Sequence, residues 1–227
     1  MAADAIFGNL DRGLHLHARE GNDGAGQVTP LRVPCFTPGT RVATPDGERP
    51  VHELRAGDRV VTRDNGLQEV CWVGRCRLDW HRLASERHMK PVLIEAGALG
   101  HGLPERDMLV SPQHRVLVAN ERTQLFFEER EVLVAAKHLI NHGSIREIDA
   151  PGVTYVHFMC ARHEVVLSNG AWTESFQPAD RSLKGMGNAQ RVELFEIFPE
   201  LAGSEGREGY GAARKTLKAH EAKLLAS

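Results

Sequence analysis

Residues 41–73 read RVATPDGERPVHELRAGDRVVTRDNGLQEVCWV, and this stretch decides the fold class. Short apolar runs alternate with Pro-Asp-Gly, Ala-Gly-Asp and Asp-Asn-Gly turns at intervals of about ten residues. Asn65-Gly66 lies between two of these runs, and Asn-Gly is the strongest short hairpin signal. The stretch therefore predicts an all-β domain, with apolar runs at 41–44, 50–54, 59–62 and 67–73.

The same pattern continues downstream. Between the strands, a short helix is expected at 134–141. Alternation with period two along 155–160 places Tyr155, His157 and Met159 on one face of a strand and the residues between them on the other. Further strands are expected at 91–95, 108–111, 115–119, 132–134, 145–148, 153–161 and 164–167.

Composition and hydrophobic periodicity divide the chain into three parts. Residues 1–33 are rich in Gly and Asp without periodicity, which predicts a flexible leader. The β pattern occupies 34–178. Residues 179–227 form a helical extension, with one helix at 188–198 that Pro199 ends and a second at 213–225. In the first helix, Val192, Phe195 and Phe198 form the expected apolar stripe.

Composition excludes several classes of protein. The 227 residues carry 28 Lys and Arg against 30 Asp and Glu, so no basic excess favours nucleic acid. Neither a membrane span nor a secretory signal peptide is visible, so we expect a monomeric, cytoplasmic protein, with export lacking such a signal as the alternative. Four cysteines are too few for a disulfide scaffold.

Three features could carry chemistry. Cys35 stands where the leader meets the first strand, and its thiol is close to the carbonyl of Pro34 by covalent geometry. Ser111 and His114, three residues apart before an apolar strand, could aim a hydroxyl and a proton donor at one amide. His157 and His163 flank the next turn. Each alone has a plainer interpretation: a buried cysteine, a turn with a solvated histidine, or core histidines.

Together these features resemble one known family. Cys35-Phe36-Thr37-Pro38-Gly39-Thr40, Gly57-Asp58-Arg59-Val60 and Ser111-Pro112-Gln113-His114, followed by the block from His163 to Phe176, are similar to the Hint (Hedgehog/intein) superfamily, most closely its bacterial branch. The resemblance covers about 34–178. It implies a compact, horseshoe-like all-β fold, here with a C-terminal helical extension.

The resemblance also implies a self-processing reaction. Cys35 would attack the Pro34 carbonyl in an N-to-S acyl shift, with the chain's own N-terminal segment as substrate and water or another nucleophile as acceptor. Ser111 and His114 match the family's Thr-x-x-His pair, which holds and protonates the scissile nitrogen. His163 matches the histidine that opens the last block. His157 lies near the usual position of an aspartate, although the strict alignment places Val156 there.

Two departures limit the implied reaction. The terminal His-Asn pair of inteins is missing from 171–176, so complete splicing is not expected. Pro34 restrains the scissile carbonyl and should slow the shift. A catalytically silent Hint-fold module for binding or structure is therefore the alternative. A metal hydrolase has little support, because no Cys/His pair follows Cys71 and Cys76 at zinc spacing, and no metal or cofactor is expected.

Overall fold

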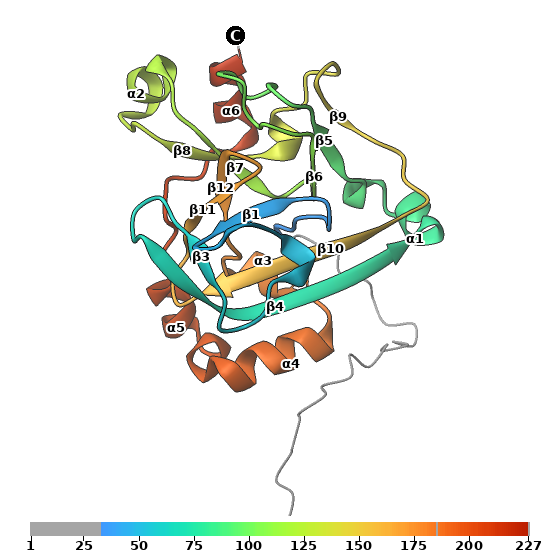
Figure 1. Cartoon of the computed structure of the whole chain (residues 1–227), viewed down its shortest axis with the longest axis vertical. Helices are drawn as coiled ribbons and strands as arrows, with labels where there is room; N and C mark the ends of the chain where they lie inside the picture. The colour runs from blue at the N-terminus through green and yellow to red at the C-terminus, as the bar shows by residue number, and fades with distance from the viewer. Residues whose placement is uncertain (1–32, 185, 227) are drawn as a thin grey trace, which may run out of the picture.

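The structure is a computed structural model that describes residues 33–184 and 186–226. The leader predicted at 1–33 lies outside these residues, except for Val33. Short strands dominate, and most of the helices follow them at the C-terminal end (Figure 1). The strands are β1 (Arg41–Thr44), β2 (Gly47–Pro50), β3 (Arg59–Val61), β4 (Leu67–Asp79), β5 (Val92–Ile94), β6 (Met108–Val110), β7 (Arg115–Val118), β8 (Val132–Ala135), β9 (Ile145–Glu147), β10 (Gly152–Cys160), β11 (Val165–Ser168) and β12 (Ala171–Glu174).

The strands form three antiparallel groups. The largest has six strands in the order β2-β1-β11-β12-β7-β8. The other two have the orders β10-β4-β3 and β6-β5-β9. β4 and β10 pair along nearly their whole length, and Figure 1 shows them as the two long arms of the fold. The predicted mostly-β fold with C-terminal helices is confirmed.

Turn chemistry explains the hairpins. Asn169 and Gly170 link β11 to β12 with φ values of 45° and 76°, a pair of positive angles that a two-residue hairpin turn needs and that Asn-Gly adopts readily. The hairpin predicted around Asn65-Gly66 is confirmed as β3–β4.

Some predicted strands are wrong in extent or type. Residues 50–54 do not form a strand: Val51–Glu53 is a single 3₁₀ turn, and the preceding four residues, 47–50, pair with β1 instead. β4 continues to Asp79 because it pairs with β10 from Gly152 to Met159 in one continuous register, before a shift between Met159 and Cys160. β12 was not predicted as a strand, and it completes the six-stranded sheet.

The helices correct the sequence prediction more often. The helix expected at 134–141 is wrong, because β8 runs to Ala135 and only the 3₁₀ turn Ala136–His138 follows. The second tail helix begins later than predicted, at Ala219. The described helices are α1 (Trp80–Ser85), α2 (Glu121–Phe127), α3 (Asp180–Lys184), α4 (Asn188–Ile197), α5 (Ser204–Gly209) and α6 (Ala219–Ala226), with the 3₁₀ turns η2 (Arg87–Met89) and η4 (Pro199–Ala202).

The predicted helix at 188–198 is confirmed as α4, but its buried face differs from the prediction. Val192 is 56% exposed, whereas Leu194 is fully buried. Val192 therefore faces away from the core, whereas the other two residues of the predicted stripe, Phe195 and Phe198, are partly buried against it.

Alternation along β10 separates two hydrophobic clusters. Val156 and Phe158 lie in the cluster between the sheets, while Tyr155 and Met159 lie in a second cluster on the opposite face. The predicted two-face arrangement of this strand is confirmed. The second cluster also contains Cys35.

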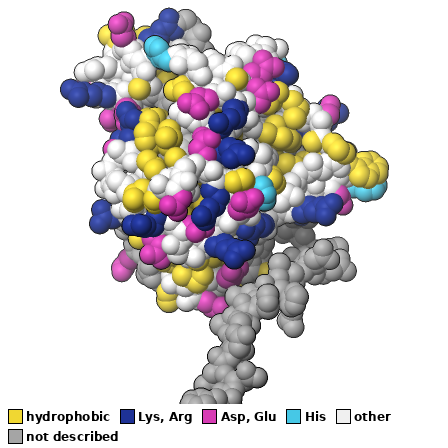
Figure 2. Space-filling model, viewed as in Figure 1, with side chains coloured by type: hydrophobic (Ala, Val, Ile, Leu, Met, Phe, Trp, Pro, Cys, Tyr) yellow, Lys and Arg dark blue, Asp and Glu magenta, His cyan; other side chains and the backbone are white. Residues whose placement is uncertain are grey.

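The surface has mixed charge on the side that Figure 2 shows, where basic and acidic side chains are interspersed. Within residues 33–184 and 186–226, no helix combines the length and apolar character that a membrane span requires.

Candidate active site

The backbone of residues 35 and 36 is held between β6 and β10. The Phe36 N–H donates to the Val156 carbonyl at 2.7 Å, and the Val156 N–H donates back to the Phe36 carbonyl at 2.9 Å. On the other side, the Ser111 N–H donates to the Cys35 carbonyl at 2.9 Å. Because Cys35 precedes the bridged residue, its side chain points to the opposite face from Phe36, into the second cluster.

The Cys35 thiol is fully buried and has two polar neighbours. Its Sγ lies 3.4 Å from the Nδ1 of His157 and 3.4 Å from the carbonyl oxygen of Val33. Burial raises the pKa of the thiol well above its ordinary value, because a thiolate there would lose its hydration. The resting group is therefore a neutral thiol within reach of an imidazole nitrogen.

Ser111 binds the amide of the Pro34–Cys35 bond itself. Its Oγ accepts a hydrogen bond from the Cys35 N–H at 2.9 Å and donates one to the Val33 carbonyl at 3.0 Å. These two bonds fix the hydroxyl against the nitrogen of the Pro34–Cys35 bond. The geometry thus brings together two of the residues expected from sequence.

His157 faces the thiol from β10 inside an aromatic enclosure. Its ring centroid lies 5.0 Å from that of Trp72 and 5.4 Å from that of Phe176. Burial lowers the pKa of His157 to about 3, so the ring is neutral and able to accept a proton at Nδ1. Its Nε2 is buried without a hydrogen-bond partner among the described residues.

His114 lies one layer away, against the ring of Phe36. The two ring centroids are 4.2 Å apart. Burial lowers the pKa of His114 to about 4, and neither ring nitrogen has a hydrogen-bond partner in the described part of the chain. The ring is therefore neutral and packs against Phe36, the residue that follows Cys35.

His163 occupies a different environment. Its Nδ1 accepts from the Ala213 N–H at 2.9 Å, which leaves Nε2 protonated and donating to Glu174 at 3.1 Å. Glu174 is fully buried and also accepts from Arg115 at 2.8 Å. Burial alone would raise the pKa of Glu174, but Arg115 and His163 outweigh it and hold that pKa below its usual range. His163 thus connects Glu174 at the end of β12 to the C-terminal segment at Ala213, and both of its ring nitrogens have partners.

The nucleophile, the amide-binding hydroxyl and the histidines around them occur in one matched family segment. The family model described as the Hint domain matches residues 34–180. The chain belongs to the Hint domain family. It is a domain of the self-processing kind.

Solved structures with a similar fold include several inteins. A bacterial intein-like domain from Clostridium thermocellum is 13% identical with a TM-score of 0.41, covering 62% of this chain and 97% of that one. The gp41-1 intein is 14% identical with a TM-score of 0.35, covering 62% and 97%. A DnaB intein from Synechocystis is 8% identical with a TM-score of 0.38, covering 63% and 98%. A search of curated proteins finds no match.

Sequence reasoning missed three contributors to this Hint site. Glu174 gave no signal because its burial depends on the pairing of β11 with β12. Trp72 and Gly74 were not singled out from the sequence either. Gly74 pairs directly with His157 across β4–β10, and only the strand register reveals that contact.

Gly74 lies directly against the His157 ring, so a methyl group at this position should lower the stability of the fold. A Cβ at this position would lie 2.3 Å from His157 Nε2 and 2.4 Å from Trp72 Cη2. We expect Gly74→Ala to destabilise the Hint domain by about 1–3 kcal/mol and to displace His157 from the thiol. Urea unfolding measures the first effect. Gly39→Ala is the matched control, because nothing lies within 4 Å of its Cβ. Equal stability of both variants would contradict the prediction.

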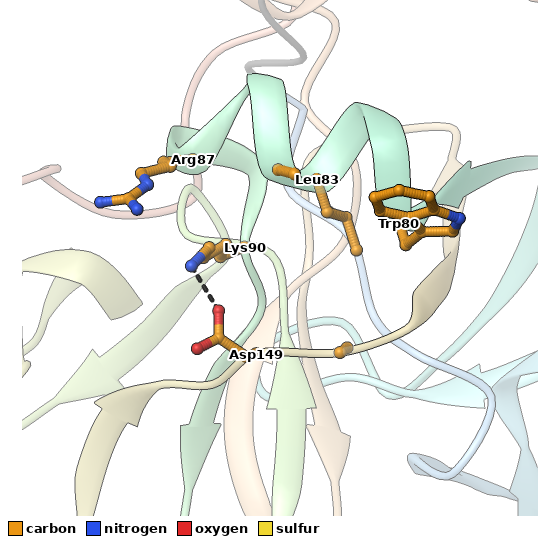
Figure 3. A pocket seen from close by; sticks show the side chains of 7 residues that line it. Trp80, Leu83, Arg87, Lys90 and Asp149 are labelled. Atoms are coloured by element: carbon orange, nitrogen blue, oxygen red, sulfur yellow. Dashed lines mark hydrogen bonds and ion pairs between the residues drawn. The ribbon is translucent and has the colours of Figure 1, made fainter.

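A surface pocket lies elsewhere on the Hint domain. It has a volume of about 250 Å³ and is lined by Trp80, Leu83, Arg87, Lys90 and Asp149, among others. Figure 3 shows the Lys90–Asp149 ion pair at its edge. Among residues 33–184 and 186–226, no three His, Cys, Asp or Glu side chains come together as metal ligands.

Proposed function

We propose that this Hint domain cleaves the Pro34–Cys35 bond by an N-to-S acyl shift. Cys35 Sγ forms a bond to the Pro34 carbonyl carbon, the bond from that carbon to the Cys35 nitrogen breaks, and the thiol proton ends on the released amine. The N-terminal segment is then held as a thioester. The observation that carries the proposal is the thiol 3.4 Å from His157 Nδ1 while Ser111 binds the scissile N–H.

Each polar group has a task in this reaction. His157 accepts the thiol proton as the sulfur attacks, since its Nδ1 is the nearest imidazole nitrogen to Sγ. Ser111 orients the amide nitrogen, and His114 assists its protonation, as the family motif implies. His163 acts as a positioning residue through Glu174 and Arg115.

Release of the segment ends the reaction without splicing. The stretch 171–176 forms β12 and the residues that follow it, and it lacks the asparagine that would cyclise. Water or another nucleophile therefore takes the acyl group from the thioester. The products of hydrolysis are the fragments 1–34 and 35–227.

A catalytically silent Hint module for binding or structure is the second candidate. Burial raises the thiol pKa and lowers the His157 pKa, and both shifts oppose proton transfer between these groups. A buried scissile bond preceded by proline adds to the barrier.

Intact-mass spectrometry separates the two candidates. The purified chain is incubated with and without dithiothreitol at pH 7 to 9. We expect thiol-dependent appearance of the fragments 1–34 and 35–227. Absence of both fragments at every thiol concentration and pH would leave the silent module as the function.

A further inference from the structure

The C-terminal helices share a hydrophobic cluster with the nucleophile. Cys35 and Val33 belong to the second cluster, and they are 0% and 1% exposed. The family model ends at residue 180, so almost all of the helical segment lies beyond it. Figure 1 shows α4 and α5 below the long β4–β10 pair. The buried contributions of this segment to the cluster are Leu183, Met186, Leu194 and Leu201.

Hydrogen bonds attach the helical segment to the strands around the site. The Tyr210 hydroxyl donates to the Cys160 carbonyl at 2.7 Å, at the end of β10. The Gln190 side chain donates to the Arg75 carbonyl on β4. The segment is thus fixed to both long strands, on the face that carries His157.

The helices α4 and α5 themselves bury few residues, although Phe195, Phe198 and Tyr210 are also partly buried against the cluster. Leu194 is the buried residue of α4, and none of the residues of α5 is buried. Short helices with few buried residues open at a lower free energy than the strands beneath them. The segment can therefore detach locally while the β domain stays folded.

We propose that α3, α4, η4 and α5 form a cap that closes the Cys35 site and controls which nucleophile reaches the thioester. The effect of the cap on the thioester rests on the proposed acyl shift, whereas the cap itself is inferred from the packing of the helices in the cluster of Cys35. In hydrolysis, a water oxygen bonds to the Pro34 carbonyl carbon, the carbon–sulfur bond breaks, and a water proton returns to the Cys35 sulfur. With the cap closed, water cannot reach that carbon, so the acyl group is kept until the cap opens.

Cysteine alkylation tests the cap independently of cleavage. Leu194→Ala weakens the cap, and Val192→Ala, 56% exposed on the same helix, is the matched control. Iodoacetamide labelling of the full chain is followed by peptide mass mapping of Cys35 and Cys160. Both thiols are 0% exposed, but Cys160 lies in the cluster on the other face of β10. We expect Leu194→Ala to raise labelling of Cys35 about tenfold or more, with Cys160 and the Val192→Ala chain unchanged.

Every result decides the question. Equal rises at Cys35 and Cys160 mean global unfolding, and no rise at Cys35 means that the helices do not close the site; either result overturns the cap. Leu201→Ala, at the far end of the cap, must repeat the selective rise. Fragment release without added thiol should then also rise in Leu194→Ala. Selective labelling without any cleavage would keep the cap and reject the acyl shift.

Discussion

Cys35→Ala is expected to remove thiol-dependent cleavage between residues 34 and 35 completely. The reaction needs a bond from Sγ to the Pro34 carbonyl carbon, and alanine offers no nucleophile. The substitution deletes one small buried group, at a cost on the order of 1 kcal/mol, so the fold should persist. Intact mass after incubation with dithiothreitol measures the loss.

Cys160→Ala is the matched control for this prediction, because Cys160 is equally buried on the opposite face of β10. It should cleave like the unchanged chain. Cys35→Ser adds a second check: a serine can form only an ester, which hydroxylamine cleaves and dithiothreitol does not. Cleavage of the Cys35→Ala chain at the same bond would show that a contaminating protease, and not this thiol, cuts there.

Cys35 could be predicted from the sequence because the proposed reaction takes place between neighbouring residues. Cys35 is bonded through one peptide unit to the group it attacks, so no fold is needed to place them together. Ser111 could be predicted for a related reason: it follows a strand directly, and that strand borders residues 35 and 36. Motif spacing is enough when two short segments pair.

The environment of the thiol could not be predicted in the same way. Period-two alternation placed His157 on the face it occupies, but only the bridge from Phe36 to Val156 decides that Cys35 shares this face. Gly74 matters solely through its register with His157. The C-terminal segment was expected as a helical extension. Leu194 shares the cluster of Cys35 although it lies outside the predicted stripe, whose Val192 is exposed.

The lowered pKa values of His114 and His157 should make the protein acid-sensitive well above the range where carboxylates titrate. Burial lowers the pKa of His114 to about 4 and that of His157 to about 3, whereas both return to about 6.5 on unfolding. Below pH 6.5, therefore, these two rings bind protons in the unfolded chain but stay neutral in the folded chain. Stability is full above that pH and falls as the pH decreases toward 4, with a limiting slope of about 2.7 kcal/mol per pH unit for two groups.

Urea unfolding at steps between pH 7.5 and 4.5 measures this slope. Glu174 does not interfere, because its pKa is lowered in the fold and its stabilising contribution is lost only below the range of an unfolded carboxyl group, about pH 4.5. His157→Gln removes one titrating group and should reduce the limiting slope to about 1.4 kcal/mol per pH unit. A slope that His157→Gln does not alter would contradict the prediction, because it would mean that the pKa of His157 is the same in the folded and the unfolded chain.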